Sequence, residues 1–133
     1  MTTPSMRGRV LVVEDEAYVR DSLVEILRAR GFDVSSSASV DEALERLARA
    51  PVDAVLSDLK MPKKDGLELV RRMQALSPDV PILILTGHGT VASAVECLKA
   101  GATDYIAKPA NLSDLVAMLW RHLPHRASAE IAA

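Results

Sequence analysis

The chain has 133 residues, of which 49 % are hydrophobic and 26 % are charged, and its formal net charge is −2. This length fits one domain with one modest core. The near-neutral charge argues against binding of nucleic acid through electrostatics, so we expect no direct nucleic-acid contact. Cys97 is the only cysteine, which excludes an intrachain disulfide and a zinc site built from several cysteines.

Membrane-spanning and secretory patterns are not found in the sequence. Apolar runs such as residues 82–85 are far shorter than the ~20 residues that a membrane helix needs. Residues 1–9 do not contain the apolar stretch of a signal peptide. We therefore expect a cytoplasmic protein with no membrane partner.

Short apolar runs alternate along the chain with longer amphipathic stretches. This pattern predicts five strands, at residues 10–13, 33–36, 54–57, 81–85 and 104–107, of which the second is short and polar. The chain has no hairpin signals between them, so this alternation predicts a parallel sheet with helices on both faces. We assign residues 9–123 to this domain, residues 1–8 to an N-terminal tail and residues 124–133 to a C-terminal tail or linker.

The predicted helices have recognisable start and stop signals. The first helix covers residues 17–30, and Val91, Val95 and Leu98 are predicted to form the buried stripe of the fourth. The N-cap residues of the later helices are predicted to be Ser39, Asp65, Thr90 and Asn111. The residues that end helices are predicted to be Gly31, Pro51, Gly101 and Pro124.

Residues with reactive or charged side chains follow four of the predicted strands, where ligands bind in sheets of this kind. They are Glu14, Asp15, Glu16, Asp58, Thr86 and Lys108. Carboxylates crowded at one edge repel one another, and a hard divalent cation relieves the repulsion. Mg²⁺ suits the site because it binds carboxylates and also accepts phosphate oxygens. A carboxylate beside the ion can attack phosphorus to form an acyl phosphate, while an ammonium group offsets the developing charge.

Four segments at these strand ends resemble the motif set of bacterial two-component response-regulator receiver domains. They are Glu14-Asp15, residues 58–66 (DLKMPKKDG), Thr86-Gly87 and Lys108-Pro109. Residues 87–91 and 94–105 are similar, in addition, to the receivers of nitrogen-regulation-type activators. The resemblance implies a flavodoxin-like, doubly wound α/β fold: a five-stranded parallel sheet in the order 2-1-3-4-5 with five helices.

The resemblance also implies a role for each residue of the acidic cluster. Asp58 would be the phosphoacceptor, and Mg²⁺ would be bound by Asp15, Asp58 and the backbone carbonyl of Lys60. Glu14 would assist the ion through a water molecule. Many relatives have Asp where this chain has Glu14, and the extra methylene leaves open whether this carboxylate contacts the metal directly.

A conformational switch follows from the same resemblance. Lys108 would hold a phosphoryl oxygen, Thr86 would form a hydrogen bond with the phosphoryl group, and Tyr105 would turn inward as Thr86 moves. The face formed by the fourth helix, the fifth strand and the fifth helix would then change shape and favour a homodimer. The Lys108-Pro109 bond is expected to be cis. Ala110 replaces an aromatic residue that many relatives carry, which weakens the case for this partner surface.

The expected function is that of a signalling module. A sensor histidine kinase would donate the phosphoryl group, and an output domain beyond the C-terminus would receive the signal. The chain would act as an enzyme only on itself, in gaining and losing its own phosphoryl group. Lys60 and His88 would lie beside the path of the attacking water and influence how long the group persists.

Two other functions share parts of the same pattern. Phosphatases of the haloacid-dehalogenase type also form an aspartyl phosphate, but they carry Asp-x-Asp after the first strand, whereas Asp58 follows the third predicted strand. A flavodoxin-like cofactor binder would need a glycine-rich phosphate loop after the first strand, and it would use aromatic residues, which make up only 3 % of this chain.

Overall fold

The computed structural model describes residues 8–87, 90–108 and 111–123. Within these residues, strands and helices alternate strictly along the chain, as the apolar runs predict. The strands are β1 (Arg9–Val13), β2 (Asp33–Ser37), β3 (Ala54–Ser57), β4 (Ile82–Thr86) and β5 (Asp104–Ala107). The helices are α1 (Ala17–Ala29), α2 (Val40–Arg49), α3 (Gly66–Leu76), α4 (Val91–Ala100) and α5 (Leu112–His122). The predicted bounds differ from these by a residue or so at several ends.

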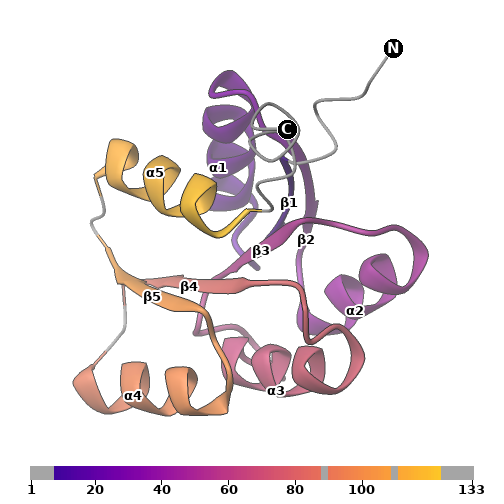
Figure 1. Ribbon diagram of the computed structural model, residues 1–133, viewed down its shortest axis with the longest axis vertical. Helices are drawn as coiled ribbons and strands as arrows, with labels where there is room; N and C mark the ends of the chain where they lie inside the picture. Colours follow the sequence, from indigo (N-terminus) through magenta and orange to yellow (C-terminus); the bar gives the residue numbers. More distant parts are fainter. Residues whose placement is uncertain (1–7, 88–89, 109–110, 124–133) are drawn as a thin grey trace, which may run out of the picture.

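The five strands form one parallel sheet in the order β2-β1-β3-β4-β5, which confirms the predicted fold. Helices α1 and α5 cover one face of the sheet, and α2, α3 and α4 cover the other (Figure 1). From β1 the chain moves outward to β2 and then returns to β3 on the other side of β1. In folds of this kind, ligands bind at the carboxyl ends of the strands on either side of such a reversal, which here are β1 and β3.

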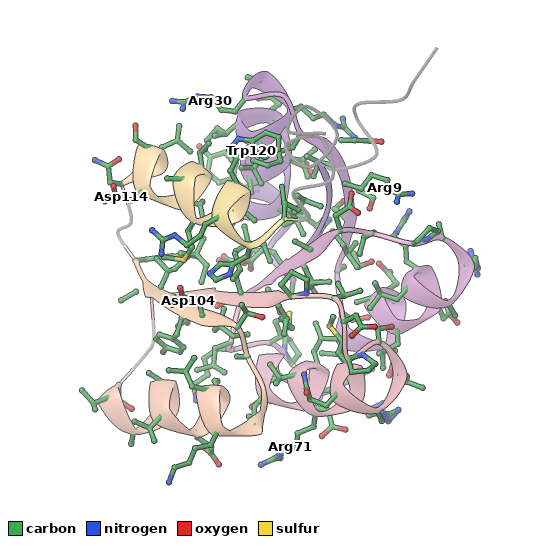
Figure 2. The ribbon with its side chains drawn as sticks, viewed as in Figure 1. Arg9, Arg30, Arg71, Asp104, Asp114 and Trp120 are labelled. Carbon is green, nitrogen blue, oxygen red and sulfur yellow. The ribbon has the colours of Figure 1, made fainter. Side chains whose placement is uncertain are left out.

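Apolar side chains fill the space on both faces of the sheet (Figure 2). In β1, Leu11 and Val13 pack with α2 and α3, whereas Val10 and Val12 pack with α1 and α5. This alternation follows from the two-residue period of a strand. A strand buried on both faces has no polar side, which explains the continuous apolar run at residues 10–13.

The predicted N-caps are confirmed. Each cap side chain accepts a hydrogen bond from a backbone N–H of the first helical turn. The pairs are Ser39 with Glu42, Asp65 with Glu68, Thr90 with Ser93, and Asn111 with Ser113 and Asp114. Gly31 and Gly101 follow α1 and α4 with positive φ angles of 97° and 122°, a conformation that favours glycine after a helix.

The predicted buried stripe of α4 is wrong. Val91, Val95 and Leu98 are 83 %, 43 % and 45 % exposed, and the buried side of the helix carries Cys97 instead. The spacing of the three residues correctly indicates that they share a face, but periodicity does not say which face meets the sheet. The helix therefore presents an apolar stripe on the outside of the domain.

Candidate functional site

Three carboxylates meet at the carboxyl ends of β1 and β3. One side-chain oxygen from each of Glu14, Asp15 and Asp58 lies within 4.8 Å of the others. Glu14 and Asp15 directly follow β1, and Asp58 directly follows β3. The sheet thus brings together acidic residues that are far apart in the sequence, at the edge that the strand-end pattern indicates.

Backbone hydrogen bonds fix this cluster to the sheet. The N–H of Glu14 donates to the carbonyl of Ser37 at 3.1 Å, and the N–H of Asp58 donates to the carbonyl of Val13 at 3.0 Å. These bonds continue the pairing of β1 with β2 and of β1 with β3 for one residue beyond the strands. The Asp58 side chain is oriented by a hydrogen bond from the N–H of Leu59 to Oδ1, at 2.7 Å.

The start of α3 packs tightly against Asp58. A Cβ atom built on Gly66 would overlap the backbone carbonyl oxygen of Asp58, so this close approach requires glycine. The N–H of Gly66 also donates to the carbonyl of Leu59 at 2.8 Å. The loop that follows Asp58 is therefore closed back onto the end of β3.

Glu14 is the buried member of the cluster, with a residue exposure of 2 %, whereas Asp15 and Asp58 are half-buried. Burial is the main reason that the pKa of Glu14 rises from 4.5 to about 7, and the negative charges of Asp58 and Asp15 raise it further. The N–H of Glu16, which donates to Oε2 at 3.1 Å, and the ammonium of Lys108 act in the opposite direction.

Lys108 brings a positive charge to the cluster from β5. Its Nζ lies 3.9 Å from Oε1 of Glu14, and its backbone N–H donates to the carbonyl of Thr86 at 2.9 Å. Thr86 is fully buried at the end of β4. A Cβ atom on Gly87 would lie 3.8 Å from the Lys108 side chain, so the lysine stem passes close to this backbone.

Tyr105 lies on β5, half-buried against the core on the side of α3 and α4. Its hydroxyl is 3.2 Å from Oγ of Ser93, a residue in the first turn of α4. Ser93 also takes part in the capping box with Thr90. The tyrosine is thus linked to the start of α4, a contact that the sequence did not indicate.

The predicted site also includes residues outside the carboxylate cluster. Lys60 is exposed in the loop after β3. The predictions for His88, for Ala110 and for the cis bond before Pro109 fall outside the described residues.

The donor set fits a small divalent cation. The three carboxylate oxygens lie within 4.8 Å of one another, near enough for one small divalent cation to interact with them together. All three donors are hard oxygen atoms, which Mg²⁺ prefers. The pKa of Glu14 is raised mainly by burial and further by the charges of Asp58 and Asp15, and a bound cation would favour the ionised form of this carboxyl group.

The family model of the response regulator receiver domain matches residues 10–120. The chain belongs to this family. The transcriptional regulatory protein FixJ of Bradyrhizobium diazoefficiens is 42 % identical to it over 119 residues, which cover 90 % of this chain and 57 % of FixJ. The C4-dicarboxylate transport transcriptional regulatory protein DctD of Rhizobium meliloti is 43 % identical over 100 residues, covering 75 % of this chain and 22 % of DctD. The matched region thus spans between about a fifth and about three fifths of the length of these relatives.

Solved structures agree with this identification. The beryllofluoride-activated NtrC4 receiver domain dimer matches with a TM-score of 0.81 and 30 % identity, over 86 % of this chain and 95 % of that one. The family expected from the sequence motifs is thereby confirmed, and the chain is a receiver domain of two-component response regulators. Within its described part, no helix is long and apolar enough to cross a membrane.

The raised pKa of Glu14 predicts that stability depends on pH when no divalent cation is present. The folded chain holds this proton more tightly than the unfolded chain, so the stabilising contribution is complete below pH 4.5 and is lost as the pH rises through about 7. Urea unfolding between about pH 5 and about pH 8 should show the unfolding free energy falling more steeply in the wild type than in Glu14→Gln, which has no proton to release. Equal slopes in the two proteins would contradict this assignment.

Proposed function

We propose that this receiver domain accepts a phosphoryl group from a sensor histidine kinase on the carboxylate of Asp58, in a reaction that requires Mg²⁺. The observation that carries the proposal is the meeting of three carboxylates and the Lys108 ammonium at the carboxyl edge of the sheet, at the ends of β1 and β3. Asp58 is the proposed acceptor because it is half-exposed, whereas Glu14 is buried, and because the resemblance to receiver motifs gives this role to Asp58 rather than to the similarly exposed Asp15. A kinase-bound phosphohistidine can therefore approach it.

In the proposed reaction, an oxygen of Asp58 attacks phosphorus, the phosphorus–nitrogen bond of the phosphohistidine breaks, and the imidazole leaves with the electron pair. The hydrogen bond from Leu59 to Oδ1 holds the attacking carboxylate in one orientation. Asp15, Asp58 and the backbone carbonyl of Lys60 would hold Mg²⁺, with Glu14 assisting through water. When bound, this ion supplies positive charge to the phosphoryl oxygens.

Lys108 has the second positive charge of the site. In the proposed product, its ammonium leaves the 3.9 Å contact with Glu14 and holds a phosphoryl oxygen at Asp58. The exchange is favourable because a phosphoryl group carries more negative charge than one carboxylate.

The proposed response to phosphorylation passes through Thr86 and Tyr105. Thr86 would form a hydrogen bond with the phosphoryl group and leave space that the Tyr105 ring enters. Because the Tyr105 hydroxyl contacts Ser93, this movement would break a contact to α4 and alter its position. Phosphorylation need only favour one of two existing arrangements by a few kcal/mol.

The exposed apolar stripe of α4 supports the proposal that the face formed by α4, β5 and α5 binds a second copy of the receiver. Val91, Val95 and Leu98 give this face apolar area that water disfavours. The NtrC4 receiver domain, which is similar to this chain, is a dimer in its beryllofluoride-activated form.

The remaining parts of the proposal concern the whole protein. We assign residues 9–123 to the receiver, residues 1–8 to an N-terminal tail and residues 124–133 to a C-terminal tail or a linker. FixJ and DctD are transcriptional regulatory proteins that are longer than the matched region, which supports an output domain joined to the receiver, and we propose that it lies beyond the C-terminus. The receiver would work in the cytoplasm without binding nucleic acid directly, and it would catalyse only its own phosphorylation and dephosphorylation.

Acetyl phosphate with Mg²⁺ should add one phosphoryl group to the wild type and none to Asp58→Asn, because an amide is a far poorer nucleophile than a carboxylate. Intact-mass spectrometry measures the product directly. Asp79→Asn is the matched control, since it makes the same change at an exposed turn and should be labelled like the wild type. Labelling of Asp58→Asn at the wild-type level would refute the assignment of the acceptor.

Beryllofluoride with Mg²⁺, a mimic of the phosphoryl group, should increase the mass of the wild type toward that of a dimer in light scattering. Val95→Asp should stay monomeric, because a charge in the centre of the α4 stripe would have to be buried without a partner. Leu76→Asp changes an exposed leucine on α3, away from this face, and should associate like the wild type. Association of Val95→Asp to the same extent as Leu76→Asp would rule out the α4 face.

A further inference from the structure

Glu14 and Asp15 are neighbours in sequence, yet both carboxylates belong to one cluster with Asp58. In an extended strand, successive side chains point to opposite faces, and successive carbonyl groups also point in opposite directions. Two adjacent residues of β1 could therefore not both face Asp58 if the strand continued. The chain must turn within residues 14–16, between the end of β1 and the start of α1.

Arg20 holds this turn from the first part of α1. A single guanidinium nitrogen, Nη1, donates to the carbonyl of Glu14 at 2.9 Å and to the carbonyl of Asp15 at 3.4 Å. Two consecutive carbonyls that contact one nitrogen must point toward the same place, which the extended conformation does not allow. The Arg20 side chain thus forms hydrogen bonds with two carbonyl groups whose common direction is found in the turn and not in an extended strand.

The arginine is itself well anchored. Its backbone N–H donates to the carbonyl of Glu16 at 2.9 Å, which makes it part of the first hydrogen-bonded turn of α1. It is half-buried, so its hydrogen bonds are partly shielded from water. The turn is therefore joined to a rigid helix rather than to a loop.

We propose that Arg20 is a positioning residue of the cation site. By holding the carbonyls of Glu14 and Asp15 together, it keeps both carboxylates directed at Asp58, without touching the reacting atoms itself. This inference rests on the proposed function, because it assigns Arg20 a task in the binding of Mg²⁺.

The sign of the effect separates positioning from simple charge. The guanidinium is a cation near a cation site, so its charge alone opposes Mg²⁺ binding, and removing it would tighten the complex. Loss of positioning acts in the other direction, because the carboxylates would no longer be held in place before the ion arrives. Weaker Mg²⁺ binding after removal of a positive charge can therefore be attributed to geometry.

The experiment is a calorimetric titration of the chain with MgCl₂, comparing wild type, Arg20→Met and Arg28→Met. Arg28 is the matched control because it lies on the same helix and its Nη2 also donates to a backbone carbonyl, that of Val34, at 2.9 Å. Arg20→Met should bind Mg²⁺ about tenfold more weakly than the wild type, which corresponds to about 1.4 kcal/mol. Arg28→Met should bind Mg²⁺ like the wild type, although it also loses a charge and a hydrogen bond.

A second readout uses labelling by acetyl phosphate as a function of Mg²⁺ concentration. In Arg20→Met the concentration needed for half-maximal labelling should rise about tenfold, and saturating Mg²⁺ should restore the labelling. Arg20→Lys keeps the positive charge, but its ammonium lies closer to the helix backbone than Nη1 does and cannot reach both carbonyls in the same way, so it should also bind Mg²⁺ more weakly than the wild type. This variant tests the inference if Arg20→Met does not fold.

Each outcome of the titration either supports or overturns the positioning role of Arg20. Equal or tighter Mg²⁺ binding by Arg20→Met, or wild-type binding by Arg20→Lys, would overturn the positioning role while leaving the cation site and the phosphoacceptor intact. Equal weakening in Arg28→Met would overturn it as well, because the effect would then not be specific to the turn. If the wild type itself bound no Mg²⁺, the proposed cation site would fail first and the role of Arg20 with it.

Discussion

The mutual repulsion of three carboxylates at one edge of the sheet is the interaction on which the rest of the site depends. Folding places Glu14, Asp15 and Asp58 within 4.8 Å of one another, and it buries one of them. The chain partly relieves the repulsion itself, through the Lys108 ammonium and a raised pKa at Glu14. A cation or phosphoryl group that arrives at the site meets charges that the fold already holds together. Because of this preorganisation, a small domain can respond to cation binding or to phosphorylation.

Most of the fold could be predicted from the sequence because its signals are local. The four N-caps and the apolar strands are determined by neighbouring residues, and all of them were found. The orientation of α4 could not be predicted in the same way. This helix has apolar residues on more than one side, and which of them is buried depends on how α4 packs against α3 and β5.

The acidic cluster could be predicted because parallel strands end at the same edge of the sheet. Residues at the strand ends therefore lie close together, regardless of the conformation of the loops that follow them. The contacts that orient the cluster could not. Arg20 contacts backbone carbonyls, which every residue has, and Gly66 is needed only because α3 approaches Asp58 so closely. Such contacts depend on the three-dimensional path of the backbone and have no counterpart in a residue pattern.

The central claim, that this edge of the sheet binds a divalent cation, is tested most directly by paramagnetic relaxation with Mn²⁺ in place of Mg²⁺. In amide NMR spectra of the wild type, the signals of residues 14–16, 58–60 and 86–87 should broaden first, and added Mg²⁺ should restore them. The amides of residues 26–32, at the end of α1 and just before the amino end of β2, lie at the opposite edge of the parallel sheet from the site and serve as the internal reference. Broadening that is spread over exposed acidic residues throughout the chain, or that Mg²⁺ does not reverse, would contradict the account.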